Sequence, residues 1–318
     1  MAINNSPSSK FHIKAVLQAL FVTFLWSTSW VLIKIGLQAS LPAITFAGLR
    51  YSIAFLCLLP FILINPTHRN AVRNFSRAAW TQLALLGLVF YTLTQGAQFI
   101  SLSFLPAATL SLLLNFSPIF IALSSIFLKE ETPSIIQWGG IVLSTIGAII
   151  YFLPLDIPSG QILGLTIALI GVLANSGAAL LGRRVNHQSG LSPIVVTVIS
   201  MGIGGLLLLI IGTATQGFGQ LDLTQWLIIV WLAIVNTAIA FTLWNKTLQT
   251  LTAVESSIIN STMLPQIAIL AWIFLGEPLN IRQIIGIILV GIGTLIVQLW
   301  RHSPGQEKIR ANKPTGDS

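Results

Sequence analysis

Charged residues are scarce in this chain. Its 318 residues include 16 basic and 8 acidic side chains, 8% of the sequence, whereas 54% are hydrophobic. A soluble domain usually carries about a quarter charged residues, so this chain cannot cover a water-facing surface of its own size. The mean hydropathy of +0.87 agrees with this. The composition excludes a soluble enzyme and a disordered or fibrous chain, and it predicts a polytopic helical membrane protein.

Motifs for catalysis and metal binding are also missing. Cys57 is the only cysteine, which excludes a disulfide framework and a cysteine-rich metal site. The sequence has no P-loop and no GxSxG, HExxH or paired-carboxylate catalytic motif. We therefore expect no enzymatic activity, no cofactor and no metal. The apolar run from Ala15 is too long for a signal-peptide core and no cleavage site follows it, so it predicts a first permanent helix.

Apolar runs of membrane-spanning length recur along the chain. A helix needs about 20 residues to cross a hydrocarbon core of roughly 30 Å, and the helix satisfies every backbone amide internally. The predicted fold class is therefore all-α integral membrane. The ten predicted transmembrane helices lie at about 15–35, 43–64, 79–100, 107–128, 134–153, 160–181, 193–213, 224–244, 253–275 and 281–300.

Lysine and arginine are unevenly divided between the connecting loops. Cytoplasmic loops carry an excess of these residues. With the N-terminus in the cytoplasm, 13 of the 16 fall on the cytoplasmic side, Lys34 and Arg282 fall outside, and Arg50 lies within the second span. This predicts cytoplasmic tails at 1–14 and 301–318 and a multi-pass protein of the cell membrane. It also explains the net charge of +8 without nucleic acid, because the inner leaflet is anionic.

Two halves of the sequence align with each other. The fourth and ninth spans match at an offset of 147, which pairs Pro118 with Pro265 and Glu130 with Glu277. Because each half contains five spans, an odd number, the second half enters the membrane from the opposite side. Inverted repeats of this kind are typical of secondary transporters with a binding site near the midplane. The two predicted five-helix repeats cover 15–153 and 160–300.

Several local patterns reinforce that interpretation. Trp26-Ser-Thr-Ser-Trp30 with Lys34 marks the first span, the stretch from Pro42 to Arg50 opens the second, and the pattern Pro…Phe-Leu…Glu…Gly occurs twice. Together these residues resemble the EamA-type exporters of the drug/metabolite transporter superfamily, over about 15–300. The resemblance implies alternating-access export of a small organic solute, such as an amino acid or related metabolite. Ser27 departs from the family pattern, which often has glycine there.

Arg50 is the strongest candidate for a substrate contact. It lies about seven residues into the second span, roughly 10 Å deep at 1.5 Å per residue. A charged side chain at that depth faces the bundle interior or a water-filled cavity. Arg50 is interpreted either as the anchor of a carboxylate or other anionic group, or as a structural residue that binds backbone carbonyls or reaches outward. It aligns with Met201, so only one repeat carries this charge.

Other polar and aromatic side chains within the spans complete the predicted site. Trp26 and Trp30 share one face of the first helix and form either a cavity wall or an ordinary packing surface. Amides within spans, including Gln98 and Asn175, bind either substrate or a neighbouring helix. The predicted substrate-binding residues are Trp26, Trp30, Arg50, Tyr91, Gln95, Asn115, Asn236 and Asn260.

Pro118 and Pro265 lie in the middle of their spans. Each removes one backbone N–H and leaves the carbonyl four residues earlier without its helical donor. Kinked helices at matching positions of two halves point to a transport site. The alternative is a kink that only shapes packing, with Asn115 or Asn260 capping the released carbonyl.

Three acidic residues are candidates for coupling or gating. Glu255 is either a proton carrier or part of a capping box that begins at Thr252 and opens the ninth helix. Glu130 and Glu277 lie at helix C-terminal ends, where the helix dipole disfavours a carboxylate. They either pair with loop cations and latch gates on opposite faces, or remain solvated.

Two other functions and the oligomeric state stay open. A phosphorylated-sugar or nucleotide-sugar exchanger would need several buried basic residues, and only Arg50 qualifies. A membrane-embedded lipid-modifying enzyme would need an acidic cluster, whereas Asp156 and Asp222 stand alone. Glycine-rich helices pack within one chain or between chains, so a monomer and a homodimer both fit. The expected partners are a small-molecule substrate and the lipid bilayer.

Overall fold

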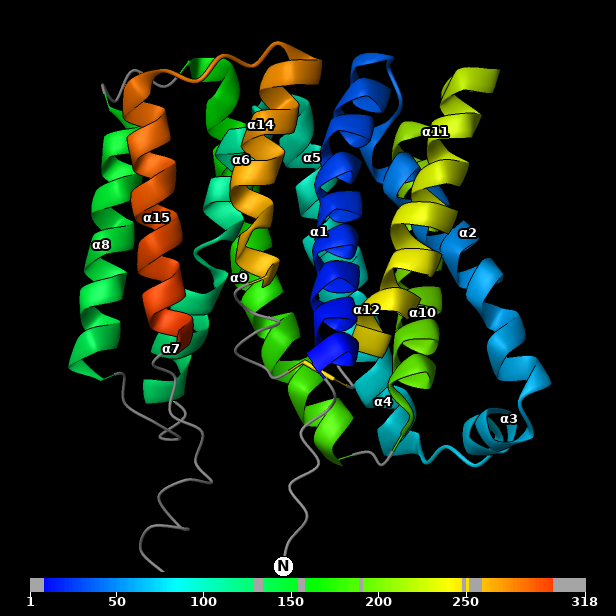
Figure 1. The fold of residues 1–318 in the computed structure, drawn as a ribbon. Coiled ribbons are helices and arrows are strands. Elements are labelled where there is room, and N and C mark those ends of the chain that lie inside the picture. Colours follow the sequence, from blue (N-terminus) through cyan, green and yellow to red (C-terminus); the bar gives the residue numbers. More distant parts are fainter. Residues whose placement is uncertain are drawn as a thin grey trace, which may run out of the picture.

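The structure is a computed structural model that describes residues 9–127, 134–153, 158–188, 191–247, 250–251 and 259–299. Helices joined by turns and irregular connections make up these ranges, and no strand occurs in them (Figure 1). Within these ranges, seven helices are long and apolar enough to cross a membrane: His12–Gln38, Ala43–Ile64, Arg77–Phe104, Ile135–Phe152, Ser159–Gly182, Pro193–Gln216 and Leu223–Trp244. Three shorter apolar helical stretches cover Ala107–Ile121, Ile259–Leu275 and Ile281–Val297. The protein is therefore a multi-pass helical membrane protein.

The helices follow one another with short connections. In chain order they are α1 (Ser9–Gln38), α2 (Ala43–Ile64), α3 (Pro66–Arg73), α4 (Arg77–Leu86), η1 (Gly87–Gln95), α5 (Gly96–Phe104), α6 (Ala107–Leu114), α7 (Ser117–Phe127), α8 (Ile135–Phe152), α9 (Ser159–Gln188), α10 (Pro193–Gln216), α11 (Leu223–Ala233), η2 (Ile234–Ile239), α12 (Ala240–Thr247), α14 (Met263–Leu275) and α15 (Ile281–Leu299).

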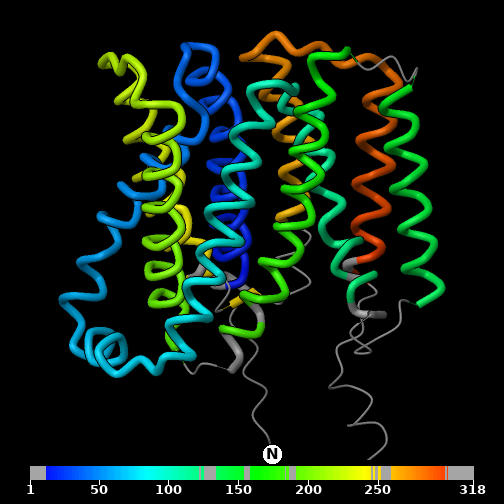
Figure 2. Tube along the Cα trace, turned by 180° about the vertical axis from the view of Figure 1, so that it is seen from behind, coloured from blue at the N-terminus to red at the C-terminus, as the bar shows by residue number. Residues whose placement is uncertain are grey.

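The helices stand side by side and run between two ends of the bundle (Figure 1). We call the end at which α1 finishes and α2 starts the upper end, and the end at which α1 starts and α2 finishes the lower end. Seen from the front and from behind, α8 and α15 pair at one flank, while α2, α3 and α11 lie at the other (Figures 1 and 2). The largest buried cluster joins α1, α2, η1, α5 and α10 through residues such as Phe46, Tyr91, Phe99 and Met201.

Two spans contain π-helical turns, which the sequence does not predict. The segments η1 and η2 interrupt α4–α5 and α11–α12 respectively. In both, a threonine hydroxyl donates to the carbonyl five residues earlier: Thr94 to Val89 at 2.9 Å and Thr237 to Leu232 at 2.8 Å. Turns of this kind are rare and often occur at functional sites.

The fourth span is broken where the sequence places Pro118. α6 ends at Leu114 and α7 begins at Ser117, so Pro118 occupies the first turn of α7, where a missing N–H costs least. Similarly, α14 begins at Met263, and Pro265 lies in its first turn.

Helix caps explain several of these boundaries. The capping box of Ser134 and Gln137 opens α8, and Asp222 with Gln225 opens α11 in the same way. The short helix α3 begins after Asn65, whose side chain accepts from the Thr67 N–H at 3.0 Å. The spans predicted at 43–64 and 79–100 leave these residues as a connection, so the sequence does not predict α3.

Glycines allow backbones to approach closely, as expected for helix packing in a membrane. At Gly204 in α10, an added Cβ would lie 2.2 Å from the carbonyl oxygen of Gly87 in η1. At Gly177 in α9, an added Cβ would meet nothing within 4 Å. The two glycines therefore differ in tolerance to a methyl group.

Replacement of Gly204 by alanine is expected to destabilise the protein by about 1–3 kcal/mol, because the methyl group must separate two packed backbones. The matched variant Gly177→Ala is expected to be neutral or slightly stabilising, since alanine is the better helix former. The apparent midpoint of thermal unfolding in detergent measures both. Equal midpoints for the two variants would contradict the close packing of α10 on η1.

Candidate functional site

A cavity of about 410 Å³ lies inside the bundle. Its wall comes from α1, α2, η1, α5, α6, α7, α9, α12 and α14, together with residues just before α14. Six of the residues predicted from the sequence to bind substrate line it: Trp26, Trp30, Arg50, Gln95, Asn115 and Asn260. Gln98 and Asn175 line it as well. The helical fold thus gathers polar groups from distant parts of the chain in one interior space.

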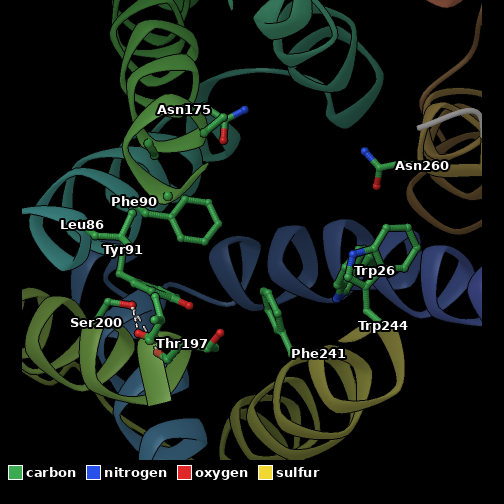
Figure 3. A pocket seen from close by; sticks show the side chains of 14 residues that line it. Trp26, Leu86, Phe90, Tyr91, Asn175, Thr197, Ser200, Phe241, Trp244 and Asn260 are labelled. Atoms are coloured by element: carbon green, nitrogen blue, oxygen red, sulfur yellow. Dashed lines mark hydrogen bonds between the residues drawn. The ribbon is translucent and has the colours of Figure 1, made fainter. Parts of the chain in front are cut away.

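A second cavity of about 550 Å³ adjoins the first, because Trp26, Phe90, Asn175, Phe241 and Asn260 line both. The second cavity adds Gly182, Thr197 and Trp244, near the lower ends of α9, α10 and α12, and Leu86, the last residue of α4. In Figure 3, Asn175 and Asn260 border this space opposite Tyr91 and Phe241. Together the two cavities extend from the interior of the bundle toward its lower end.

Arg50 lies in the wall of the inner cavity and is only 5% exposed. Its Nε donates to Oγ1 of Thr237 at 3.0 Å, and one terminal nitrogen, Nη2, lies 3.5 Å from Oγ of Ser29. The guanidinium carbon is 5.3 Å from the centre of the Tyr51 ring. Asp222 and Glu277 are the only carboxylates in the part of the chain that the structure describes, and neither pairs with Arg50. The guanidinium therefore keeps donors for a ligand.

Aromatic rings cover one side of the two cavities. Trp26 contacts Phe241 and Trp244, with ring centres 5.3 and 5.2 Å apart. Tyr91 contacts Phe90 and Tyr51 at 4.9 and 5.4 Å. Of these rings, only Trp26 and Tyr91 are predicted from the sequence to bind substrate. Phe241 and Trp244 are three residues apart in one predicted span, and this spacing is the signal that would have found them.

Most of the amides around the cavity are already engaged. Gln95 accepts a hydrogen bond from the Tyr51 hydroxyl at 2.7 Å. Asn175 donates to Oγ of Ser117 at 3.0 Å, which ties α9 to α7. Asn115 donates to the Ser111 carbonyl at 2.9 Å rather than to that of Leu114. These hydrogen bonds fix the positions of the wall residues. Asn260, by contrast, is exposed, lines both cavities and faces the open space.

Asn236 lines neither cavity. Its side chain is fully buried and donates to the Leu25 carbonyl and to Oγ1 of Thr28, the latter at 3.0 Å. Asn236 thus fastens η2 to α1. The next residue, Thr237, makes the contact with Arg50.

The two prolines border different spaces. Pro118 lines the inner cavity, and so does Leu114, whose carbonyl lacks a helical N–H donor because of Pro118. Pro265 instead lines an apolar groove of about 390 Å³ between α14 and α15, with Trp272 and Ile287. Only the break in the fourth span therefore reaches the cavity directly through its proline.

Two charged residues hold the turn between α5 and α6 at the upper end. Nζ of Lys34 donates to the carbonyls of Leu102 and Leu105, both at 2.6 Å. The carboxylate of Glu277 accepts from the Ala107 N–H at 2.8 and 3.1 Å. Burial raises the pKa of the Glu277 carboxyl above its ordinary value, and the Lys34 ammonium and the backbone N–H groups oppose this. Glu130 and Glu255 lie outside the described residues.

The chain matches the sequence profile of the EamA-like transporter family over residues 13–153 and again over 162–299. It is 29% identical to the uncharacterised transporter YvbV of Bacillus subtilis over 87% of this chain and 89% of that one. It is 26% identical to the S-adenosylmethionine/S-adenosylhomocysteine transporter of Chlamydia trachomatis, over 84% of each chain.

A crystal structure of another protein has the same fold. It superposes with a TM-score of 0.63 at 18% identity, over 90% of this chain and 98% of the other. The relatives are named as transporters, and the protein is therefore a transporter of small molecules rather than an enzyme. Because the family profile matches nearly its whole length, the chain belongs to the EamA-like transporter family.

Proposed function

We propose that this protein is a secondary transporter that exports a solute bearing a carboxylate, an amino acid or a related metabolite, by alternating access. In this proposal the chain crosses the cytoplasmic membrane ten times, as two inverted five-helix repeats over 15–153 and 160–300. Both termini are cytoplasmic, so the lower end of the bundle faces the cytoplasm. Solute would then enter the cavities from the cytoplasmic side.

The positions of the irregular turns support the repeat. The π-helical segments begin at Gly87 and Ile234, which are 147 residues apart, the same offset that separates Pro118 from Pro265. Broken and distorted helices at matching positions of two halves are typical of transporters whose site lies at the repeat interface.

Arg50 is the observation that carries the proposed substrate class. A buried guanidinium with no carboxylate partner in the described part of the chain lines the cavity and retains free donors. Guanidinium binds carboxylate through two parallel hydrogen bonds, which gives both strength and orientation. A carboxylate of the solute would complete this arrangement.

The aromatic wall supports a solute with an apolar or ring-bearing portion. Trp26, Phe241 and Trp244 offer ring faces to whatever fills the cavity. Amino acids with aromatic side chains combine a ring with a carboxylate. S-adenosylmethionine, which the relative from Chlamydia trachomatis is named for, does so too.

The upper end supplies the closed gate in this proposal. Lys34 from the first half and Glu277 from the second hold opposite sides of the α5–α6 turn. Glu130, the repeat equivalent of Glu277, would act at the other end. No carboxylate of the described ranges lines the cavity, which supports solute exchange without proton coupling.

A counterflow assay tests the proposal. Proteoliposomes loaded with an unlabelled solute should accumulate the labelled form without an ion gradient. The panel should contain aromatic and aliphatic amino acids, their decarboxylated amines, S-adenosylmethionine and phosphorylated sugars. We expect exchange of one carboxylate-bearing class, little exchange of its amine, and no response to a pH gradient. Exchange of phosphorylated sugars alone would favour the exchanger alternative, and liposomes without protein give the baseline.

A further inference from the structure

The second π-helical turn links α1 and α2 through two consecutive residues. Asn236 donates to the carbonyl of Leu25 in α1, and Thr237 accepts from Nε of Arg50 in α2. In a regular α-helix, successive side chains point about 100° apart. The wider turn of η2 places both of these side chains in contacts with neighbouring helices.

The hydroxyl proton of Thr237 is already committed. Its Oγ1 donates to the carbonyl of Leu232, five residues earlier, at 2.8 Å. A hydroxyl group has one proton, so the same oxygen has only lone pairs left for Arg50, whose Nε lies 3.0 Å away. Thr237 is fully buried, which keeps bulk water from competing for this position. The π turn thus makes Thr237 an obligatory acceptor for the guanidinium.

Ser29 in α1 has the same arrangement on a second nitrogen. Its Oγ donates to the Leu25 carbonyl at 3.3 Å, and Nη2 of Arg50 lies 3.5 Å from it. The two hydroxyls therefore fix one side of the guanidinium. The other terminal nitrogen, Nη1, has no protein partner among the described residues, and Arg50 lines the cavity.

We propose that Thr237 is a positioning residue that orients Arg50, so that the two terminal nitrogens of its guanidinium meet a planar carboxylate of the solute. This inference rests on the proposed function, since it requires a carboxylate-bearing solute. A long side chain normally loses rotamer freedom when a ligand immobilises it. A guanidinium held in place beforehand avoids part of this loss, which favours carboxylates over neutral groups.

Thr237→Val tests the role with little change in shape, because valine keeps the branched side chain and lacks only the hydroxyl. We expect the carboxylate concentration for half-maximal transport to rise about tenfold, the usual consequence of losing a hydrogen bond to a charged group. The maximal rate should change little, and transport of the decarboxylated amine should not change. Thr237→Ser restores the hydroxyl and should return the wild-type value.

Thr242→Val is the matched control. Thr242 lies in the same span, is exposed, and donates to its own helix at the Ala238 carbonyl, 2.8 Å away. It should leave half-saturation unchanged. An equal rise for Thr242→Val and Thr237→Val, or no rise for Thr237→Val, would overturn the inference while leaving the proposed function intact.

A second measurement needs no transported solute. Phenylglyoxal modifies arginine, and mass spectrometry can quantify its reaction at Arg50 relative to the exposed Arg282 of the same molecule. Thr237→Val should increase the relative reaction at Arg50 severalfold, because the guanidinium is no longer held. An unchanged relative rate would overturn the positioning role even if no solute of the panel were exchanged. A faster reaction with unchanged half-saturation would overturn the role in carboxylate binding.

Discussion

Replacement of Arg50 by glutamine is expected to reduce exchange of the carboxylate-bearing solute by about a hundredfold or more. The reason is that the variant removes both the charge and the planar fork that pairs with a carboxylate. Arg50→Lys keeps the charge without the fork and should fall between the two. Counterflow at several solute concentrations measures all three proteins. Arg282→Gln, at an exposed position near the start of α15, is the matched control and should transport normally.

Stability separates this loss from misfolding. Arg50 is buried without a carboxylate partner in the described ranges, and burying a charge without such a partner costs free energy. We therefore expect Arg50→Gln to unfold at the same temperature as the wild type or higher. The decarboxylated amine is itself a cation and should bind Arg50→Gln at least as well as the wild type, because the variant removes a like charge. An equal loss for the carboxylate-bearing solute and its decarboxylated amine, or a large fall in unfolding temperature, would show that Arg50 has a structural role instead.

Hydropathy and helical periodicity predict the helices and part of the cavity. The predicted second span, 43–64, coincides with α2 at Ala43–Ile64. Trp26, Trp30 and Arg50 line the same cavity, because residues one turn apart share a helix face and a deep charge must point inward. These inferences depend only on the regular geometry of a single helix.

Hydropathy and helical periodicity do not predict the two π-helical turns. A π turn adds one residue to the repeat, and its sequence has no distinguishing composition, so η1 and η2 were not anticipated. The added residue changes which side chain faces the cavity region. The sequence predicts that the amide of Asn236 binds substrate, whereas in the structure Asn236 donates to α1 and Thr237 contacts Arg50.

Hydrogen bonds between helices also cannot be predicted from a single sequence. Tyr51 follows Arg50 directly and would be expected to point away from it around the helix. The structure shows that both side chains line the cavity and that the Tyr51 hydroxyl bonds Gln95 of η1. Similarly, Glu277 reads as a poorly placed acid at the end of its own helix. Its favourable partner is the start of another helix, α6, which has no other side-chain cap.

Removal of the Glu277 side chain is expected to open the upper end of the bundle. Glu277→Ala leaves the first N–H of α6 without its carboxylate acceptor and removes the hydrogen bonds that join the segment after α14 to the start of α6. Leu105, in the turn held by Lys34 and Glu277, is fully buried and serves as the reporter position. In a Cys57→Ser background, a cysteine at position 105 should react with a membrane-impermeant maleimide at least about tenfold faster when Glu277 is alanine, which corresponds to about 1.4 kcal/mol.

Asp222→Asn is the matched control, because Asp222 also caps a helix at the upper end and asparagine is an equally good cap. It should leave the labelling rate at position 105 unchanged. Dividing each rate by that of a cysteine at the exposed position Phe218 cancels the effect of pH on the thiol itself. Equal labelling rates at position 105 with glutamate and with alanine at position 277 would show that other contacts keep the upper end closed.

The pH dependence of this labelling has a definite sign. Burial raises the pKa of Glu277 while the upper end is closed, despite the opposing Lys34 ammonium, and the pKa returns toward its ordinary value when opening exposes the carboxyl to water. The closed form therefore binds the proton more tightly, so acid favours closure and labelling should rise with pH above the ordinary carboxyl range. The Tyr151 hydroxyl of α8, 2.9 Å from Oγ1 of Thr109, also faces Glu277. Glu277→Gln, a neutral side chain that still accepts from Ala107, should label slowly at every pH. A wild-type rate that falls as pH rises would contradict this linkage.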